Sequence, residues 1–485
     1  MSFTLSRDVN PSKVFIEMKT NVTGRWDPFY FRPELVALEK RVKKVAPDRL
    51  RGFVRSMAGG ATPSTTESEA HYTESDEGVP FIRVQNLSTT GRLSLEDCKR
   101  ITRSTHEGLL KRSRLSGGEL LVKITGVGRM AVASVVPEDF EGNINQHIVA
   151  IRTKDIATSE TLAAYLNLDM AERLASRRST GGTRPALDYP ALLSIPVVFD
   201  EQIPELMQAA VKRHQEQVKK AEALLVTIDD VLLDELGIPS KPEPPNTLES
   251  RIFKSRFPAV TGQRWDPLFH QSDVFTFVRD AKCDLKRLGG HVEYFITGFP
   301  AGRGDQVDEE DGGVIQIRPT NLNDDRELIF RRNVYISAKE LKTRKADVLK
   351  RSEVLFNNTN SQEQVGKTVW FDLEGDYFSS NHITRIKTKS DDLNPQYLAA
   401  LLNLYQRKKV FFKLCTNWNN QSGVGSDILA RMPVPLPKPG RQEAIVGKLE
   451  AVRDKALALR EQARADLEKA KRDIEDLILG KGASE

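Results

Sequence analysis

The chain has 485 residues and a formal net charge of +5 at pH 7, with 39% hydrophobic and 29% charged residues. This length accommodates roughly two to four domains. No apolar run reaches the roughly 18 residues of a membrane span, and the N-terminus lacks the apolar core of an export signal. The three cysteines are too few for a disulfide framework and too widely spaced for a zinc motif, so we expect a cytoplasmic protein.

In chain order, two stretches of mixed α and β character each precede a long helix. Each stretch has a strand ending in an asparagine turn, then a strand with its hairpin partner, then an amphipathic helix before a polar glycine loop. The expected strands are 79–84, 119–125 and 133–136 in the first stretch and 314–317, 354–357 and 367–371 in the second, and the expected helices are 159–177 and 394–414.

Short motifs of the first stretch recur in the second in the same order. Trp26 and Trp265 lie 239 residues apart, whereas Arg83 and Arg318 lie 235 residues apart. The matched segments are 23–28 with 261–267, 81–87 with 316–322, 118–121 with 352–355, 145–148 with 380–383, 166–168 with 402–404, and 195–197 with 432–435. Chance would not keep this order at a nearly constant distance, so we interpret the chain as a tandem duplication.

Two stretches have apolar or small residues at steps of three and four, the pattern of a helix with one buried seam. The first, 204–236, would be about 50 Å long. Gly237 and Gly480 follow the two stretches as C-terminal stops. Charged and amide residues fill the other faces, so each seam fits one partner helix and we expect a coiled coil. The seam residues are Met207, Val211, His214, Val218, Ala221, Leu225, Ile228, Leu232 and Leu236, and then Ile445, Leu449, Val452, Ala456, Leu459, Ala463, Leu467, Ala470, Ile474 and Leu477.

The predicted fold class is α/β in the broad sense, with two duplicated α+β modules that are each followed by a long helix. A linker stiffened by four prolines separates the halves. The predicted segments are a first module at 1–200, a spacer helix at 201–238, the linker at 239–248, a second module at 249–438 and a second spacer helix at 439–485.

The polar loops after the amphipathic helices are the first candidate binding surface. The first loop combines guanidinium groups and hydroxyls with two glycines, which suits phosphates and base edges, and the second carries amides that pair with adenine edges. A solvated surface loop is the alternative in both cases. The candidate residues are Arg177, Arg178, Ser179, Thr180 and Arg184 in the first loop, and Asn417, Asn419, Asn420 and Gln421 beside Trp418 in the second.

Further candidates lie close to the expected strands, and the basic ones occupy matched places in the two stretches. Basic residues just before the second strand of each stretch would form a phosphate track, and a run of asparagines after a strand would reach base edges. Their alternative roles are solvated surface and turn formation. These candidates are Arg83, Asn86, Lys111, Arg112 and Arg114, and in the second stretch Arg318, Asn321, Lys350, Asn357, Asn358 and Asn360.

No complete catalytic or metal-binding motif is present. The run Gly366-Lys367-Thr368 lacks the first glycine of a phosphate loop, because position 361 is serine. The run Asn394-Pro395-Gln396-Tyr397 departs from the Asn-Pro-Pro-Tyr/Phe signature of amino-methyltransferases and fits a helix cap better. His147 and His382 match across the repeat and are interpreted as structural. We therefore expect no catalysis, no cofactor and no metal.

The order of these motifs resembles the DNA specificity subunit of type I restriction-modification systems. The resemblance covers nearly the whole chain in both repeats and rests on segments 59–63, 80–87, 118–122, 126–128, 145–147 and 195–197, before a long helix. The second repeat departs from the first in two places. Gly298-Phe299-Pro300 replaces Gly60-Ala61-Thr62-Pro63, and the asparagine run at 357–360 replaces Ile124-Thr125-Gly126-Val127.

The resemblance implies two target-recognition domains held apart by an antiparallel helix pair. Each domain would read one half of a split sequence in double-stranded DNA, and helix length would set the gap. Two modification subunits would dock against the helices and methylate adenine with S-adenosylmethionine. Restriction subunits would supply ATP-driven translocation and cleavage. The chain itself would carry only the address, as the non-catalytic part of a phage-defence system.

Two other functions remain open, namely a coiled-coil adaptor that does not touch DNA and a methyltransferase or nuclease with degenerate motifs. If the chain reads DNA, replacing Arg177, Arg178 and Arg184 with alanine is expected to weaken binding and lower its salt dependence. If the helices are spacers, inserting four residues after Ala221 and after Ala456 is expected to lengthen the recognised gap.

Overall fold

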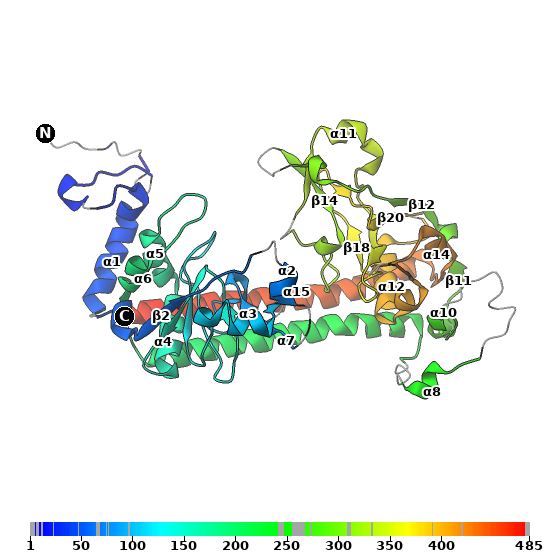
Figure 1. The fold of residues 1–485 in the computed structure, drawn as a ribbon. Coiled ribbons are helices and arrows are strands. Elements are labelled where there is room, and N and C mark those ends of the chain that lie inside the picture. Colours follow the sequence, from blue (N-terminus) through cyan, green and yellow to red (C-terminus); the bar gives the residue numbers. More distant parts are fainter. Residues whose placement is uncertain are drawn as a thin grey trace. The chain divides into compact units, whose positions relative to one another are not determined.

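The computed structural model describes residues 5, 9–10, 13–22, 24–46, 48–64, 68–73, 75, 77–95, 98–240, 247–254, 267–271, 274–307, 312–330, 333–389, 391–418 and 421–480. The predicted linker prolines at 242, 244 and 245, the second Arg-Trp-Asp run at 264–266, and Asn419 and Asn420 lie outside these residues. The chain divides into two compact units, residues 1–218 with 460–485 and residues 219–459, and each is described by itself (Figure 1).

Two four-stranded sheets make up most of the β structure of the first unit. The first sheet has the order β2-β9-β6-β7 and is antiparallel throughout. The second has the order β3-β5-β4-β8, with β4 and β8 parallel. The strands are β1 (Asp48–Arg49), β2 (Ser56–Gly59), β3 (Tyr72–Thr73), β4 (Val79–Ile82), β5 (Lys99–Ile101), β6 (Leu120–Lys123), β7 (Ala133–Val135), β8 (Asn143–Ile144), β9 (Ile148–Arg152) and β10 (Pro196–Val197), with β1 paired to β10.

The second unit repeats this topology strand for strand. Its sheets have the orders β12-β20-β16-β18 and β13-β15-β14-β19, and β11 pairs with β23. This agreement confirms the tandem duplication. One small sheet, β17-β22-β21, is an addition. The strands are β11 (Leu285–Arg287), β12 (Val292–Thr297), β13 (Gln306–Val307), β14 (Gly313–Ile317), β15 (Tyr335–Ser337), β16 (Glu353–Asn357), β17 (Thr359–Asn360), β18 (Thr368–Phe371), β19 (Phe378–Ser379), β20 (Ile383–Thr388), β21 (Thr416–Trp418), β22 (Gln421–Gly423) and β23 (Pro433–Pro435).

Each of the two predicted amphipathic helices is interrupted and forms two helices in the structure. The predicted helix 159–177 is two helices, α4 and α5, and 394–414 is α12 and α13, so both single-helix predictions were wrong. Lys409 breaks the second one with a left-handed backbone at φ 57°. Among the described residues, the α-helices are α1 (Pro33–Val45), α2 (Ser68–His71), α3 (Arg103–Glu107), α4 (Ile156–Leu166), α5 (Asp169–Arg178), α6 (Tyr189–Leu193), α7 (Gln202–Leu236), α8 (Leu248–Arg251), α10 (Pro267–Gln271), α11 (Glu340–Thr343), α12 (Pro395–Arg407), α13 (Val410–Leu414), α14 (Ser426–Arg431) and α15 (Pro439–Ile478), and short 3-10 helices accompany them.

A repeated asparagine fixes a helix against a sheet edge in each unit. Asn167 accepts a hydrogen bond from the Ala133 amide at 3.1 Å and donates to the Ala133 carbonyl at 2.8 Å. Asn403 makes the same two bonds to Thr368, at 3.1 and 2.7 Å. Both side chains are buried, so this amide satisfies the backbone of an edge strand that would otherwise lose hydrogen bonds. The recurrence of the Leu-Asn-Leu motif is therefore structural.

A repeated glycine has an equally local reason. A Cβ atom on Gly60 would lie 2.0 Å from the Asn145 carbonyl oxygen, and one on Gly298 would lie 2.1 Å from the Ser379 carbonyl oxygen. Only glycine allows the chain after β2 and β12 to approach the neighbouring strand so closely. The sequence motifs around 60 and 298 thus mark the same close contact despite their different composition.

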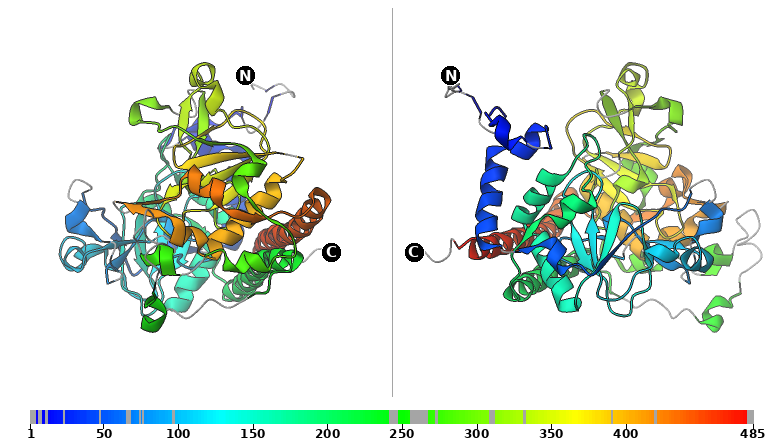
Figure 2. Two further views of the ribbon diagram at one scale, coloured as in Figure 1. Left: turned by 90° about the vertical axis from the view of Figure 1, so that its right-hand side faces the viewer. Right: turned by 60° about the vertical axis from the view of Figure 1, so that its left-hand side comes forward.

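The long helices α7 and α15 pack against each other in both units, and they run antiparallel (Figures 1 and 2). In the first unit, Met207 and Val211 share a core with Leu467 and Ile474. In the second unit, Leu225, Ile228 and Leu232 share a core with Ile445 and Leu449. The predicted coiled coil is confirmed, except that Leu477 is exposed and Ile478 is buried in its place.

Polar contacts between α7 and α15 stabilise their antiparallel orientation. In the first unit, Gln217 donates to Asp466 at 3.2 Å. In the second unit, Glu235 at the end of α7 pairs with Arg441 and Lys448 at the start of α15, at 2.8 and 2.5 Å. The glycines after the helices have left-handed backbones, with φ 67° at Gly237 and 68° at Gly480, which confirms the predicted stops.

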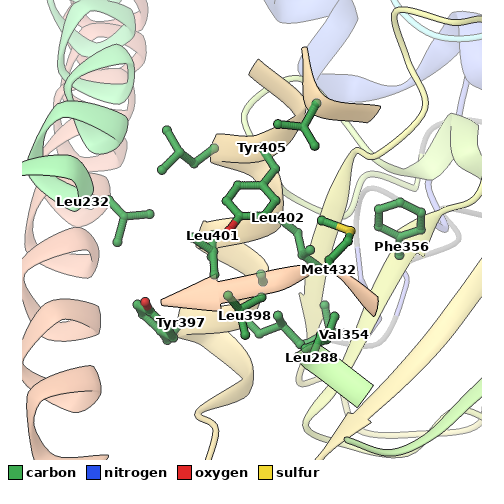
Figure 3. Close-up of a cluster of buried hydrophobic side chains, with 14 of the residues drawn as sticks. Leu232, Leu288, Val354, Phe356, Tyr397, Leu398, Leu401, Leu402, Tyr405 and Met432 are labelled. Atoms are coloured by element: carbon green, nitrogen blue, oxygen red, sulfur yellow. The ribbon is translucent and has the colours of Figure 1, made fainter. Parts of the chain in front are cut away.

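The core of the second unit joins α12 to the helix pair and the sheet (Figure 3). Tyr397 and Tyr405 are fully buried, and their hydroxyls donate to the carbonyls of Pro435 and Pro433 at 2.8 and 2.7 Å. Leu232 of α7 belongs to the same cluster. Across the described residues, no helix combines the length and the apolar character that a bilayer span requires.

Candidate nucleic-acid interface

The turn after the first strand of each parallel pair has the same construction in both units. Asn86 accepts a hydrogen bond from the Arg83 amide at 2.9 Å and donates to the Ser94 carbonyl at 2.9 Å. Asn321 makes the equivalent bonds to the Arg318 amide and the Ile329 carbonyl, both at 2.9 Å. Both asparagines are buried and hydrogen-bonded within these segments, so they close the turns. Arg83 and Arg318 are half-buried.

The basic residues before β6 and β16 are exposed. Lys111 and Arg112 lie in a 3-10 turn, Arg114 follows it and donates to the His106 carbonyl at 3.1 Å, and Lys350 occupies the matched place in the second unit. A repeated glutamate supports each segment. Glu119 accepts from the Ser116 amide and Glu353 from the Lys350 amide, both at 2.9 Å. The basic side chains thus project from a fixed backbone.

Arg177 and Arg178 are not surface residues. Both guanidinium groups pair with the carboxylate of Glu39 on α1, Arg178 at 2.8 Å, and all three residues are buried. Arg177 also lies over the ring of Tyr30, at 4.1 Å from its centroid. Burial lowers the pKa of both arginines from the usual guanidinium value. In this structure the two arginines tie α5 to α1.

The rest of the first loop lies at the surface. Thr180 and Ala186 exchange backbone hydrogen bonds at 2.8 and 2.7 Å, which closes the loop, and Ala186 also bridges to Thr125 after β6. Thr180 and Arg184 are exposed, and Ser179 is half-buried. Arg25 donates to the Arg178 and Ser179 carbonyls at 2.8 and 2.9 Å, so the Arg-Trp-Asp-Pro motif fastens the base of this loop.

In the second unit, the structure brings together two runs of amides that are about 60 residues apart in sequence. Strand β17, which ends the asparagine run, pairs with β22, and β22 forms a hairpin with β21. Asn417 and Gln421 are exposed and Asn360 is half-buried. Asn357 and Asn358 are buried, and their amides donate to the Gln364 carbonyl at 3.0 Å and to Thr384 Oγ1 at 2.9 Å. These two side chains therefore hold the backbone of this segment in place.

A cavity of about 720 Å³ opens beside this small sheet. The ring of Trp418 lies across Gly423, where a Cβ atom would be 2.4 Å from the ring, and the side chain stays 48% exposed. A half-exposed aromatic side chain can make an apolar contact with a thymine methyl group in the major groove. The polar side chains that line the cavity are Thr297, Asn358, Thr359, Asn381, Thr384, Thr416, Ser426, Asp427 and Arg431.

Sequence reasoning missed several of these residues. Asp427 and Arg431 lie on the short helix α14, which was not predicted. Asn381 stands in the repeated segment 380–383, directly before β20, and that match was a usable signal for its place beside the loops. Among the described residues, no group of three or more His, Cys, Asp or Glu side chains is arranged to hold a metal ion.

Comparison with known proteins gave one family and several solved structures. Residues 303–469 match the family model described as the type I restriction modification DNA specificity domain. No curated protein matches the chain.

Three solved structures are similar to this chain, and each alignment covers 89% of it. One belongs to a study of complex assembly and conformational transition of the type I R-M system, with 16% identity, 96% of that chain covered and a TM-score of 0.43. The HsdS subunit from Thermoanaerobacter tengcongensis has 16% identity, 95% coverage and a TM-score of 0.33. The S subunit of the type I restriction-modification system from M. genitalium has 11% identity, 94% coverage and a TM-score of 0.33.

Proposed function

Because residues 303–469 match the family model of the type I restriction modification DNA specificity domain and the first unit repeats the same topology, we propose that the chain is a DNA specificity subunit whose two domains each read one half of a split sequence in double-stranded DNA. The family is non-catalytic, and its members are subunits of a type I complex. In that complex two modification subunits would methylate adenine at the site that this chain selects, and restriction subunits would translocate and cleave. The complex would act in the cytoplasm.

The observation that carries this proposal is that two different loops are held at one scaffold position. In the first unit, the loop pairs with the segment after β6 through Thr125 and Ala186. In the second unit, the loop pairs with the segment after β16 through Thr359 and Gly423. The first loop presents hydroxyls and a guanidinium group, whereas the second presents amides and an indole ring. A DNA site with two different half-sites requires loops with different side chains at equivalent positions of the two units.

The exposed candidates divide into two roles by chemistry. Lys111, Arg112, Arg114 and Lys350 would contact phosphates, since they are exposed cations at matched places in the two units and can neutralise backbone charge. Thr180, Arg184, Asn360, Asn417 and Gln421 would contact base edges, since hydroxyl, guanidinium and amide groups match the donors and acceptors of the major groove. The buried arginines and asparagines would shape this surface without touching DNA.

Methylome sequencing tests the function directly. Cells that express this chain with its cognate modification subunits are expected to gain one methyladenine motif made of two half-sites and a fixed gap. Cells with the modification subunits alone are the control and are expected to lack it. The proposal would be contradicted if the complex forms but the cells that express this chain gain no methyladenine motif over the control cells.

Replacing Trp418 with alanine is expected to weaken binding to the full site by roughly 5- to 150-fold, because losing the recognition of one base pair in a duplex site costs about 1–3 kcal/mol. Binding is measured by titration of the assembled complex with DNA that carries both half-sites. On DNA whose second half-site is scrambled, the variant and the unaltered protein are expected to bind equally.

Leu248→Ala is the matched control, since Leu248 is 75% exposed on α8 and does not line the cavity. An equal loss for Trp418→Ala on intact and scrambled sites would contradict a contact with the second half-site.

A further inference from the structure

A second cavity in the second unit is distinct from the one beside Trp418. It is small, about 40 Å³, which is room for two or three water molecules. It lies where α12 and β18 meet α15 and the end of α7. Its polar lining includes Arg326, Trp370, Gln396, Glu450 and Arg453.

Three donors on this lining have no hydrogen-bond partner among the described residues. They are Nη1 of Arg326, the indole Nε1 of Trp370 and Nε of Arg453, and each atom is buried from solvent. Leaving a buried donor unpaired costs about 1–3 kcal/mol, and more when the group is charged. Three such donors around one cavity indicate that an acceptor normally occupies it.

The charge around the cavity favours an anion over water. Asp229 of α7 pairs with Arg326 at 2.6 Å and with Arg407 at 3.3 Å. Arg453 is close enough to lower the pKa of Arg326, although burial is the larger cause. Glu450 also lines the cavity, and its carboxylate is exposed and accepts a hydrogen bond from the Gln396 amide. Three guanidinium groups therefore face two carboxylates, Asp229 and Glu450, and one positive charge remains in excess.

The first repeat shows that the scaffold does not need these donors. The turn that holds Arg326 matches the turn at Gly91, since the bridges Leu87–Leu93 and Leu322–Leu328 enclose them. Both residues have left-handed backbones, with φ 82° at Gly91 and 67° at Arg326. This conformation costs an arginine about 1–3 kcal/mol and glycine almost nothing. Trp370 likewise stands where the first repeat has Val135. The second repeat therefore holds the donors at a cost in backbone strain.

We propose that this cavity binds a single halide-sized anion, chloride in the cell, through Arg326, Trp370 and Arg453. The anion accepts from all three donors and offsets the excess positive charge around Asp229. The volume excludes a DNA phosphate, which carries two sugar substituents, so the site is separate from DNA recognition. A bound anion would fasten α12 and β18 to the helix pair within the second unit.

Crystals of the full chain, alone or in its complex, soaked in sodium bromide give the first test. An anomalous bromide peak is expected within hydrogen-bonding distance of Trp370 Nε1 and Arg326 Nη1. Trp370→Phe keeps the ring and removes only the N–H donor, and this variant is expected to lose most of the peak. A peak without anomalous signal at this position means ordered water only, and it overturns the proposal.

Thermal unfolding gives a second readout that does not need crystals. At equal ionic strength, replacing gluconate with chloride is expected to raise the unfolding midpoint of the second unit by about 2–4 °C. Arg326→Gly copies the first repeat, relieves the strained backbone and is expected to fold without responding to chloride. The same chloride response in Arg326→Gly, Trp370→Phe and the unaltered protein would rule out a specific site.

Discussion

Replacing Glu39 with alanine is expected to destabilise the first unit by about 3–5 kcal/mol, the cost of breaking a buried ion pair by removing one partner. Glu39 is 4% exposed and its carboxylate pairs with Arg177 and Arg178, as well as with Lys43 at 2.7 Å. Without it, two buried guanidinium groups face each other with no carboxylate between them. Helix α1 then loses its polar link to α5.

Native-state hydrogen exchange measures this effect where it arises. Protection of the amides in α1 and α5 is expected to fall in Glu39→Ala, whereas protection in the second unit stays unchanged and serves as an internal control. Lys40→Ala is the matched variant, since Lys40 is exposed on the next position of α1. Unaltered protection in Glu39→Ala would show that the arginines find other partners and that the ion pair contributes little.

The same contacts change the expected result of the arginine replacements. Arg177→Ala and Arg178→Ala are expected to act on stability, and only Arg184→Ala tests a DNA contact. The sequence could not separate these roles. Arg177 and Arg178 directly precede a glycine loop, but their carboxylate partner lies more than 130 residues earlier. Helix α1 was not predicted, although Leu35, Leu38 and Val42 have helical spacing and are buried.

The sequence predicted correctly those elements whose residue spacing occurs in both repeats. The strands, the hairpins, the helix pair and its glycine stops all rest on spacing that the sequence states twice. The sequence could not assign a role to side chains whose hydrogen-bonding or ionic partner lies far away along the chain. The asparagines Asn86, Asn321, Asn357 and Asn358 have the same polarity as a base-reading amide, but in the fold they satisfy buried backbone groups. The polarity of a side chain predicts that it forms hydrogen bonds, but it does not predict whether the partner is DNA or the protein backbone.

Lengthening both long helices is expected to lengthen the gap in the recognised sequence without changing either half-site. This expectation rests on the proposed function and on the continuity of the helices, since α7 has 35 residues and α15 has 40 without a break. Inserting four residues after Ala221 and after Ala456 adds about 6 Å to each helix and turns it by only about 40°, so the apolar seam is kept. Both alanines are fully buried in one core cluster, so both insertions fall at the helix contact.

About 6 Å corresponds to the rise of roughly two base pairs of B-form DNA. Methylome sequencing of cells with the doubly inserted chain is therefore expected to show the same half-sites with a gap longer by one or two base pairs. A chain with the insertion in one helix only is the control. Its seams no longer match, and it is expected to destabilise the pair and lose methylation. An unchanged gap in the doubly inserted chain would mean that the helices do not set the spacing and that the distance between half-sites is fixed by the partner subunits.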